Sequence, residues 1–338
     1  MKKTLFALAL SVTALPAAAL ADVDLPRLDL PAALTSAVPL PMAEADLPTI
    51  TAVEYFKVAD EGIQLECPSF APDGDLYFCE VFGGRLFRLT PEKELSTVLE
   101  ENDLRPAGLE IFDNRIYVAE LGDFVDRGSV VSMAMDGSDH QDIVSRNAGF
   151  LADDLVFDAA GGFYFTDFKG GGTRPDGGVY YVGPDRGAPV PVLPNLRVAN
   201  GIGLSPDGTV LWVTEYAGGL LHRVSLADAT TIAPFGDVVT YRFTGAGPDS
   251  LRIDADGNVY VSVYGQGRVL VFNDLGLPIG QILLPGRDDG DNLRSTATII
   301  RPGTDEMLIF TNDWDGGEGS TIFAVRALAE AMSAPAQP

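Results

Sequence analysis

The sequence predicts an all-β fold, a six-bladed β-propeller, and three observations support this class. Hairpin turns with glycine precede most members of a set of recurring strands, and the chain contains 37 glycines with a hydrophobic fraction of 46%. A period in the forties with several strands per unit is typical of a propeller blade. The steps of 40, 47, 48, 48 and 49 residues separate apolar triplets that begin at Leu76, Ile116, Phe163, Leu211, Val259 and Leu308.

Residues 1–21 have the pattern of a secretory signal peptide. Lys2 and Lys3 precede an apolar stretch, and Ala19-Leu20-Ala21 fits an A-x-A cleavage site. The apolar stretch is too short to span a membrane as a helix. We therefore expect a bacterial protein that is periplasmic or secreted, with a mature chain that starts near Asp22.

The rest of the chain divides into three segments. Residues 22–48 form a lead-in rich in proline and alanine, which we expect to be extended and either to lie on the propeller or to be partly disordered. Residues 49–327 contain the blades, and the alternating stretch Thr49–Val58 is expected to complete the last blade, around 296–327. In the tail, residues 328–338, alanine enrichment around Ala327–Met332 predicts a short helix.

Tight turns separate the first two strands of the blades. Glycine supplies the positive φ that such hairpins need, and the second blade has the shorter turn Asp113-Asn114. The glycine turns are Pro72-Asp73-Gly74, Ala160-Gly161-Gly162, Pro206-Asp207-Gly208 and Ala255-Asp256-Gly257.

The net charge of the chain excludes some classes of binding partner. The formal net charge is −25 and becomes −27 once Lys2 and Lys3 are removed. Such a surface repels nucleic acid and anionic membranes, so neither is expected as a partner. The sequence gives no sign of an oligomeric state.

Four oxygen-bearing side chains share one position relative to the turns. Counting back eight residues from each turn glycine reaches Glu66, Asp153, Asn200 and Asp249. Equivalent positions converge on the axis of a closed ring, where like charges repel unless a cation lies between them. Oxygen donors from separate loops favour Ca²⁺, and Ser250 adds a further oxygen. The sequence thus predicts a central metal site; the alternative is that these residues only cap strand ends.

Other chemistries have little support. The only histidines, His140 and His222, do not sit in a metal or triad pattern. If Phe70 pairs with Leu76 across the first turn, Cys67 falls opposite Cys79, and the two could form a disulfide in an oxidising compartment. Two buried free thiols are the alternative.

Several longer motifs resemble one known family, the drug-responsive lactonases of the senescence-marker/gluconolactonase group. The resemblance runs from about Ser36 to Val325. The motifs are Asp153-Asp154-Leu155-Val156-Phe157-Asp158, Val198-Ala199-Asn200-Gly201-Ile202, Gly247-Pro248-Asp249-Ser250, Tyr264-Gly265-Gln266-Gly267-Arg268 and Leu293-Arg294-Ser295-Thr296.

This resemblance implies a calcium-dependent hydrolase that opens small-molecule lactones. It assigns a catalytic Ca²⁺ to Glu66, Asp153, Asn200, Asp249 and Ser250, and proton transfer to Asp249. It also implies a second, peripheral Ca²⁺ held in part by a loop that contains Asp126 and Gly128. The stretch Ser145–Leu151 is one residue shorter than the family pattern at that site.

One departure bears on the substrate. The sugar-lactone branch of the family has an Arg-x-Asn motif ending at the Asp153 position, whereas this chain has Leu151-Ala152-Asp153. A less polar lactone is therefore expected. Two other functions stay open at this point: a secreted binding propeller with a structural calcium, and a related esterase or organophosphate hydrolase.

Overall fold

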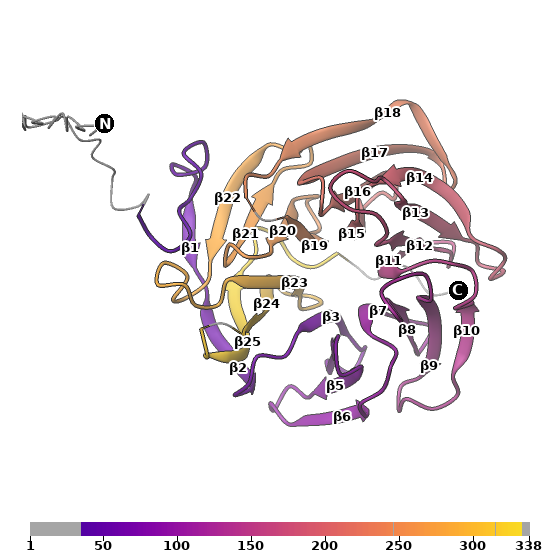
Figure 1. Ribbon diagram of the computed structural model, residues 1–338, viewed down its shortest axis with the longest axis horizontal. Coiled ribbons are helices and arrows are strands. Elements are labelled where there is room, and N and C mark those ends of the chain that lie inside the picture. Colours follow the sequence, from indigo (N-terminus) through magenta and orange to yellow (C-terminus); the bar gives the residue numbers. More distant parts are fainter. Residues whose placement is uncertain (1–34, 246, 315, 333–338) are drawn as a thin grey trace, which may run out of the picture.

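Six sheets surround a central axis in the computed structural model (Figure 1). It describes residues 35–245, 247–314 and 316–332, and within them all regular elements are strands. The six-bladed propeller expected from the repeat is confirmed. The expected signal peptide and residues 22–34 of the lead-in lie outside the described residues.

The apolar triplets that recur along the sequence are the second strands of the blades. Each pairs with an antiparallel innermost strand beside the axis, since the tight turn joins the two. The innermost strands are β3 (Leu65–Phe70), β7 (Pro106–Phe112), β11 (Ala152–Phe157), β15 (Ala199–Leu204), β19 (Pro248–Ile253) and β23 (Arg294–Ile300). The second strands are β4 (Leu76–Glu80), β8 (Arg115–Glu120), β12 (Phe163–Asp167), β16 (Val210–Glu215), β20 (Val259–Val263) and β24 (Glu306–Asp313).

Two further strands complete each blade toward the periphery. The third strands are β5 (Arg85–Leu89), β9 (Ser129–Ala134), β13 (Gly177–Val182), β17 (Leu220–Asp228), β21 (Arg268–Phe272) and β25 (Gly319–Arg326). The outer strands are β6 (Leu95–Leu99), β10 (Gln141–Val144), β14 (Val190–Leu196), β18 (Thr231–Arg242), β22 (Pro278–Leu283) and β2 (Val53–Ala59).

The N-terminal segment closes the ring. Strand β2 pairs antiparallel with β25 and completes the last blade, as the sequence predicts. The segment also contributes β1 (Thr49–Thr51), which pairs in parallel with β22 and extends the fifth blade to five strands. This second pairing was not expected, and it ties one segment to two neighbouring blades.

The turn chemistry read from the sequence is observed in the backbone. The turn glycines Gly74, Gly161, Gly208 and Gly257 have φ values of 93°, 84°, 69° and 85°. The shorter turn of the second blade has both central residues at positive φ, as a two-residue hairpin requires. The hydrophobic core consists of clusters between neighbouring blades, such as Tyr164 and Val179 of the third blade with Leu211 and Val213 of the fourth.

Every innermost strand carries a bulge near its start. In the third blade Ala152 pairs with Asp167 and Leu155 with Phe165, so three steps along β11 match two along β12. The same slip occurs in β15 and β19, and the remaining innermost strands also change register. A bulge re-aims the side chain at its position. In β3, β11, β15 and β19, the bulges lie at the residues expected to hold the metal.

The predicted helix around Ala327–Met332 is wrong. Ala331 instead forms a bridge with Asp254, and the backbone N–H of Leu328 donates to the Tyr260 hydroxyl at 2.7 Å. Alanine favours a helix only weakly, and a short isolated helix gains little. Contacts with the fifth and sixth blades therefore determine the path of this segment.

The described part of the lead-in is anchored by a buried ion pair. Glu44 bonds to Arg268, which is 0% exposed, and it also accepts a hydrogen bond from the Tyr241 hydroxyl. The Arg268 guanidinium donates further hydrogen bonds to Gln266 and Gln281. The lead-in is therefore fastened to the fifth blade through Arg268 and to the fourth through Tyr241.

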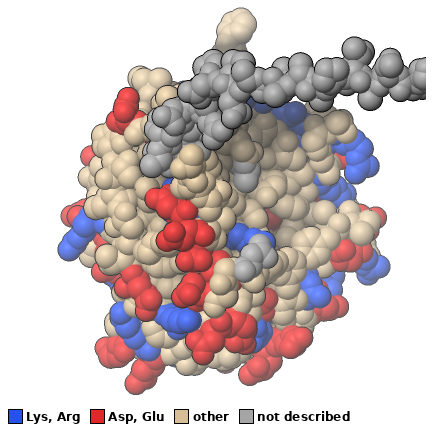
Figure 2. Space-filling view, turned by 60° about the vertical axis from the view of Figure 1, so that its left-hand side comes forward, with Lys and Arg blue, Asp and Glu red and all other residues tan. Residues whose placement is uncertain are grey.

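Acidic side chains predominate on the face of Figure 2, where they form a band, and basic side chains are scattered between them. This distribution agrees with the formal net charge of −25. No helix in the described part of the chain could cross a membrane.

Candidate active site

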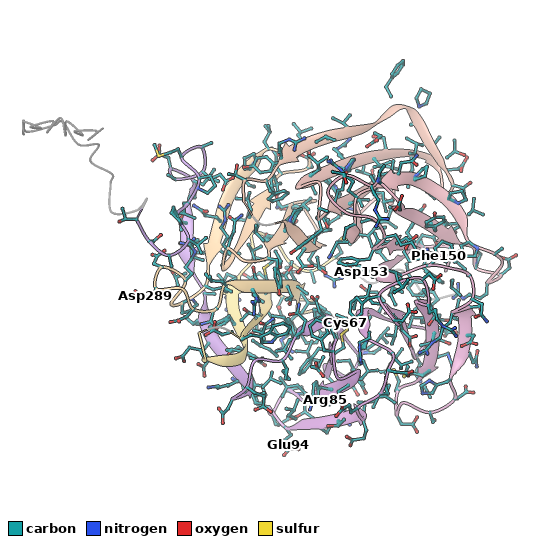
Figure 3. The ribbon with its side chains drawn as sticks, in the orientation of Figure 1. Cys67, Arg85, Glu94, Phe150, Asp153 and Asp289 are labelled. Carbon is teal, nitrogen blue, oxygen red and sulfur yellow. A yellow bond between two sulfur atoms is a disulfide. The ribbon has the colours of Figure 1, made fainter. Side chains whose placement is uncertain are left out.

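The four residues reached by counting back from the turns occupy one structural position. Glu66, Asp153, Asn200 and Asp249 are each the second residue of an innermost strand. Their side chains are between 4% and 7% exposed. Figure 3 shows Asp153 near the centre of the ring, and Cys67, the neighbour of Glu66, also near the centre, two blades away. The fold therefore gathers the predicted ligands at one end of the channel.

The three carboxyl groups of this cluster repel one another. Burial, followed by the charges of Asp249 and Asp153, raises the pKa of Glu66 well above its usual value. Burial and Asp249 do the same for Asp153. Burial raises the pKa of Asp249 to about 8, although a hydrogen bond from the Asn200 amide opposes the rise. The cluster is therefore an unfavourable arrangement of charge in the absence of a cation.

The donor chemistry fits a hard cation. The Asn200 Oδ1 atom is buried and has no hydrogen-bond partner within the described residues. A buried acceptor without a donor is costly, and an ion is one explanation for it. Ser250, the residue after Asp249, is also buried beside the cluster. In the described ranges no group of three His, Cys, Asp or Glu side chains is already arranged to hold a metal, so a cation here would need the amide and hydroxyl oxygens too.

Two threonines fix the bulges that carry the candidate ligands. The Thr166 hydroxyl accepts the Asp154 N–H at 3.0 Å and donates to the Asn200 carbonyl at 2.6 Å. The Thr214 hydroxyl accepts the Gly201 N–H at 2.7 Å and donates to the Asp249 carbonyl at 2.8 Å. Each threonine thus links the bulge of its own blade to the candidate ligand of the next.

An arginine crosses the channel below the carboxyl cluster. Arg252 donates to Glu110 at 3.0 Å and to the Thr298 carbonyl at 3.3 Å. Its charge also opposes the effect of burial on Asp154, whose pKa rises to about 7. Because these partners lie on three other innermost strands, β7, β23 and β11, Arg252 joins the blades at the axis. Sequence reasoning missed it, since no motif marks it.

An arc of aromatic rings borders the same end of the channel. One ring follows the second strand of each blade, and we call this set the aromatic collar: Phe82, Phe124, Phe168, Tyr216, Tyr264 and Trp314.

Contacts connect the collar around the opening. The Phe82 ring centroid lies 6.0 Å from that of Phe124 and 5.3 Å from that of Trp314. The Arg294 guanidinium lies 4.9 Å from the Trp314 ring and 6.0 Å from the Tyr264 ring. Centroid distances of 6.2 Å and 6.4 Å then link Tyr264 to Tyr216 and Tyr216 to Phe168.

The collar lies close to the carboxyl cluster. Burial is the main cause that raises the pKa of Tyr216, and the charge of Asp249 adds to it. For Tyr264, burial together with Asp249 and Glu66 raises the pKa to about 12, against the opposing charge of Arg294. The sequence signal was one aromatic residue just after each second strand, at offsets that vary with the loop.

The residues suggested for a second metal lie in the loop between β8 and β9. Asp126 is exposed in the loop after β8. Gly128 donates its N–H to the Phe150 carbonyl at 2.8 Å. In the same loop, the Asp123 carboxylate accepts three backbone N–H groups, which lowers its pKa. The second site stays a prediction.

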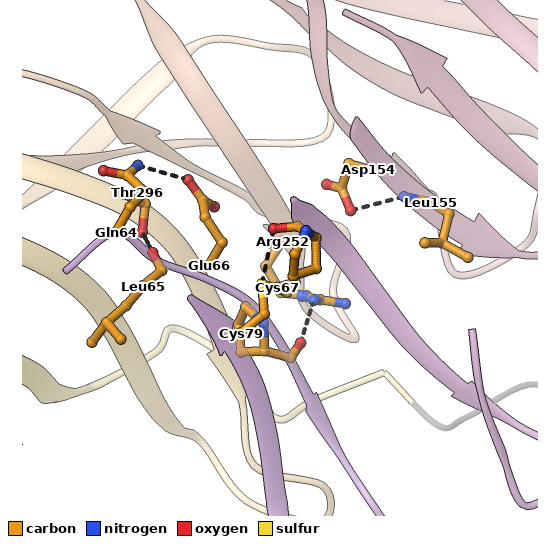
Figure 4. Close-up of a disulfide and its surroundings, with 11 residues drawn as sticks. Gln64, Leu65, Glu66, Cys67, Cys79, Asp154, Leu155, Arg252 and Thr296 are labelled. Atoms are coloured by element: carbon orange, nitrogen blue, oxygen red, sulfur yellow. Dashed lines mark hydrogen bonds between the residues drawn. A yellow bond between two sulfur atoms is a disulfide. The ribbon is translucent and has the colours of Figure 1, made fainter. Parts of the chain in front are cut away.

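Cys67 and Cys79 are joined by a disulfide, with a Cα–Cα distance of 5.7 Å (Figure 4). Phe70 does pair with Leu76, but the bulge shifts the register, so Glu66 rather than Cys67 pairs with Cys79. The assumption that the cysteines are direct cross-strand partners is therefore wrong by one residue. Glu66, beside the disulfide, also accepts a hydrogen bond from Gln64 at 3.1 Å.

Comparison with known proteins places these observations in a family. Residues 65–289 match the family described as the SMP-30/gluconolactonase/LRE-like region. The chain is 48% identical to Lactonase drp35 of Staphylococcus haemolyticus over 314 residues, covering 91% of this chain and 96% of that protein. It is 46% identical over 312 residues to Lactonase drp35 of Staphylococcus aureus, with the same coverage.

Solved structures with low sequence identity share the fold. The structure of regucalcin, a calcium-binding protein from Agrobacterium tumefaciens, superposes with a TM-score of 0.67 at 18% identity. The comparison covers 84% of this chain and 98% of that one. The matched region, the identity to the lactonases and the propeller agree: this chain belongs to the SMP-30/gluconolactonase/LRE-like family and is a lactonase-type hydrolase.

Proposed function

We propose that this protein is a calcium-dependent lactonase whose Ca²⁺ is held by Glu66, Asp153, Asn200, Asp249 and Ser250. The observation that carries the proposal is the buried carboxyl cluster with the unpartnered Asn200 oxygen among it. All of these donors are oxygens, which Ca²⁺ prefers over softer ligands. The relation to the lactonases supplies the reaction class.

The proposed reaction adds water to the ester bond of the lactone ring. The bound Ca²⁺ would supply Lewis-acid polarisation of the lactone carbonyl. Asp249 takes a proton from the attacking water and returns it to the ring oxygen when the C–O bond breaks, which yields a hydroxy acid. The bulge in β19 holds this carboxyl at the channel, and Thr214 fixes the Asp249 carbonyl from the neighbouring blade.

The aromatic collar indicates a lactone with a flat, weakly polar ring. Aromatic faces at the opening offer stacking surface and few hydrogen bonds for sugar hydroxyls. Leu151 and Ala152 are buried apolar residues at the position where sugar-lactone enzymes carry a gripping arginine. These features support the preference for a less polar lactone that the sequence suggests.

Removal of Ca²⁺ should abolish turnover. We expect the purified protein to hydrolyse a benzo-fused lactone, to lose at least about 99% of this activity in EGTA, and to regain it when Ca²⁺ is restored in excess. The measurement is the hydrolysis rate at constant pH, with circular dichroism on the same samples to verify that the fold persists.

The same assay separates the alternatives. A folded, calcium-loaded protein without turnover would overturn the lactonase and favour a binding propeller with a structural calcium. Faster turnover of aryl esters or phosphotriesters than of any lactone would favour the esterase or organophosphate hydrolase.

Removal of one collar ring should weaken binding of aromatic lactones selectively. In Phe82→Ala, the contacts with Phe124 and Trp314 are lost. We expect KM for a benzo-fused lactone to rise about fivefold, with little change for a small aliphatic lactone, because a stacked ring contributes about 1 kcal/mol. Steady-state kinetics on both substrates measures this.

Phe235→Ala is the matched control, since Phe235 is 100% exposed on the outer strand β18. Its kinetics should equal those of the unmodified protein. An equal loss on both lactones in Phe82→Ala would contradict a role of the collar in selecting the substrate.

A further inference from the structure

One position in the second strand supports a candidate ligand through a hydroxyl in the third and fourth blades and through a disulfide in the first. It lies three residues after the first residue of the recurring apolar triplet. Blades with a hydroxyl there have Thr166, Thr214, Ser262 and Thr311. The second blade has Ala119, and its innermost strand supplies no candidate ligand. The first blade has Cys79 at this position.

The hydroxyl holds the residue that follows the ligand. Asp154, which follows Asp153, donates its N–H to Thr166 at 3.0 Å. Gly201, which follows Asn200, donates its N–H to Thr214 at 2.7 Å. In the first blade, the residue that follows Glu66 is Cys67, and its side chain is bonded to Cys79. A covalent bond therefore stands where two other blades have a hydrogen bond.

The outward contact of this position is retained as well. Thr166 and Thr214 each donate to a carbonyl at the start of the next innermost strand. Cys79 Sγ lies 3.3 Å from the carbonyl of Pro106, the first residue of the next innermost strand. The disulfide sulfur thus lies where the threonine hydroxyls make their outward link, but as a packing contact, because it carries no proton to donate.

Glu66 needs this support more than a neutral ligand does. It is buried and repelled by Asp249 and Asp153. The preceding residue is held by a hydrogen bond from Thr296 to the Leu65 carbonyl at 2.6 Å, and Gln64 donates to the carboxylate itself. Figure 4 shows Glu66 between these contacts and the disulfide. Cys67 has a positive φ of 50°, which the disulfide helps to hold.

We propose that Cys79 is a positioning residue of the site, which acts through the disulfide to Cys67 and keeps Glu66 in place to bind the cation. The proposal rests on the function proposed above. Reduction by a dithiol converts the disulfide to two cysteine thiols while the dithiol becomes a cyclic disulfide. The residue after Glu66 then loses its link, and the affinity for Ca²⁺ falls.

The test measures Ca²⁺ binding by titration calorimetry on the full protein, before and after treatment with dithiothreitol. We expect reduction to weaken binding about tenfold, the range seen when groups that orient metal ligands are removed. Titration of thiols in denaturant should show two new thiols in step with this change. Circular dichroism and the thermal midpoint verify that the reduced protein is folded.

Two matched double variants separate positioning from general stability. Cys67→Ala with Cys79→Thr recreates the hydroxyl link of the third and fourth blades and should bind Ca²⁺ nearly as tightly as the oxidised protein, with or without dithiothreitol. Cys67→Ala with Cys79→Val has the same shape without the hydroxyl and should bind about tenfold more weakly. Turnover should follow the same order.

Equal Ca²⁺ affinity in the two variants, or an unchanged affinity after reduction, would overturn the positioning role. Failure of the oxidised, unmodified protein to bind Ca²⁺ at all would instead overturn the proposed function. The binding measurement therefore distinguishes the two failures.

Discussion

Asp249→Asn should lower kcat/KM for a lactone by about 10³-fold while the propeller stays folded. The substitution keeps the size of the side chain and one oxygen for a cation, but an amide cannot take a proton from water. Ca²⁺ binding should be weakened yet still measurable, because the other donors come from separate blades. Steady-state kinetics and calorimetry on the same preparation measure the two effects.

Asp256→Asn is the matched control for this prediction. Asp256 belongs to the same blade but is exposed in the turn at the opposite end of the innermost strand. Its turnover should equal that of the unmodified protein. Turnover of Asp249→Asn within tenfold of the unmodified protein would refute proton transfer by Asp249.

Glu44→Gln should lower the free energy of unfolding by about 3–5 kcal/mol. The amide leaves the guanidinium of Arg268 buried without a counter-charge, and breaking a buried pair in this way is far more costly than losing a surface pair. The hydrogen bond with Tyr241 is weakened at the same time. Urea unfolding monitored by tryptophan fluorescence measures the change.

Glu54→Gln provides the comparison, since Glu54 is an exposed residue of β2 in the same N-terminal segment. It should change the stability by less than about 0.5 kcal/mol. A loss below about 1 kcal/mol in Glu44→Gln would show that Arg268 finds other compensation.

The fold and the residues at the centre of the site could be predicted from the sequence because the geometry of a hairpin depends on residues that are close together in the chain. A tight turn fixes the register between the innermost and second strands, so a constant count from the glycine reaches an equivalent place in each blade. The bulge lies at the same distance in β11, β15 and β19, so the count to Asp153, Asn200 and Asp249 survives it.

The rest depends on contacts between blades, which no local pattern encodes. In the sequence, nothing distinguishes Arg252 from other strand residues. Its role follows from the closed ring, which brings Glu110 and Asp154 close to it. A constant count along the sequence does not find the residues of the aromatic collar, because they lie on loops of different length. The short helix expected at the tail failed for the same reason, since packing against distant blades outweighed local propensity.

The double pairing of the N-terminal segment has a consequence for the order of folding. Strands β1 and β2 pair with β22 and β25, which come from the opposite end of the described chain. These contacts have high sequence separation, and closing such long loops costs entropy, so we expect them to form late and to slow folding. Until they form, β22 and β25 are open edges that can pair with other chains. The last step of folding is therefore also the step that protects this protein from aggregation.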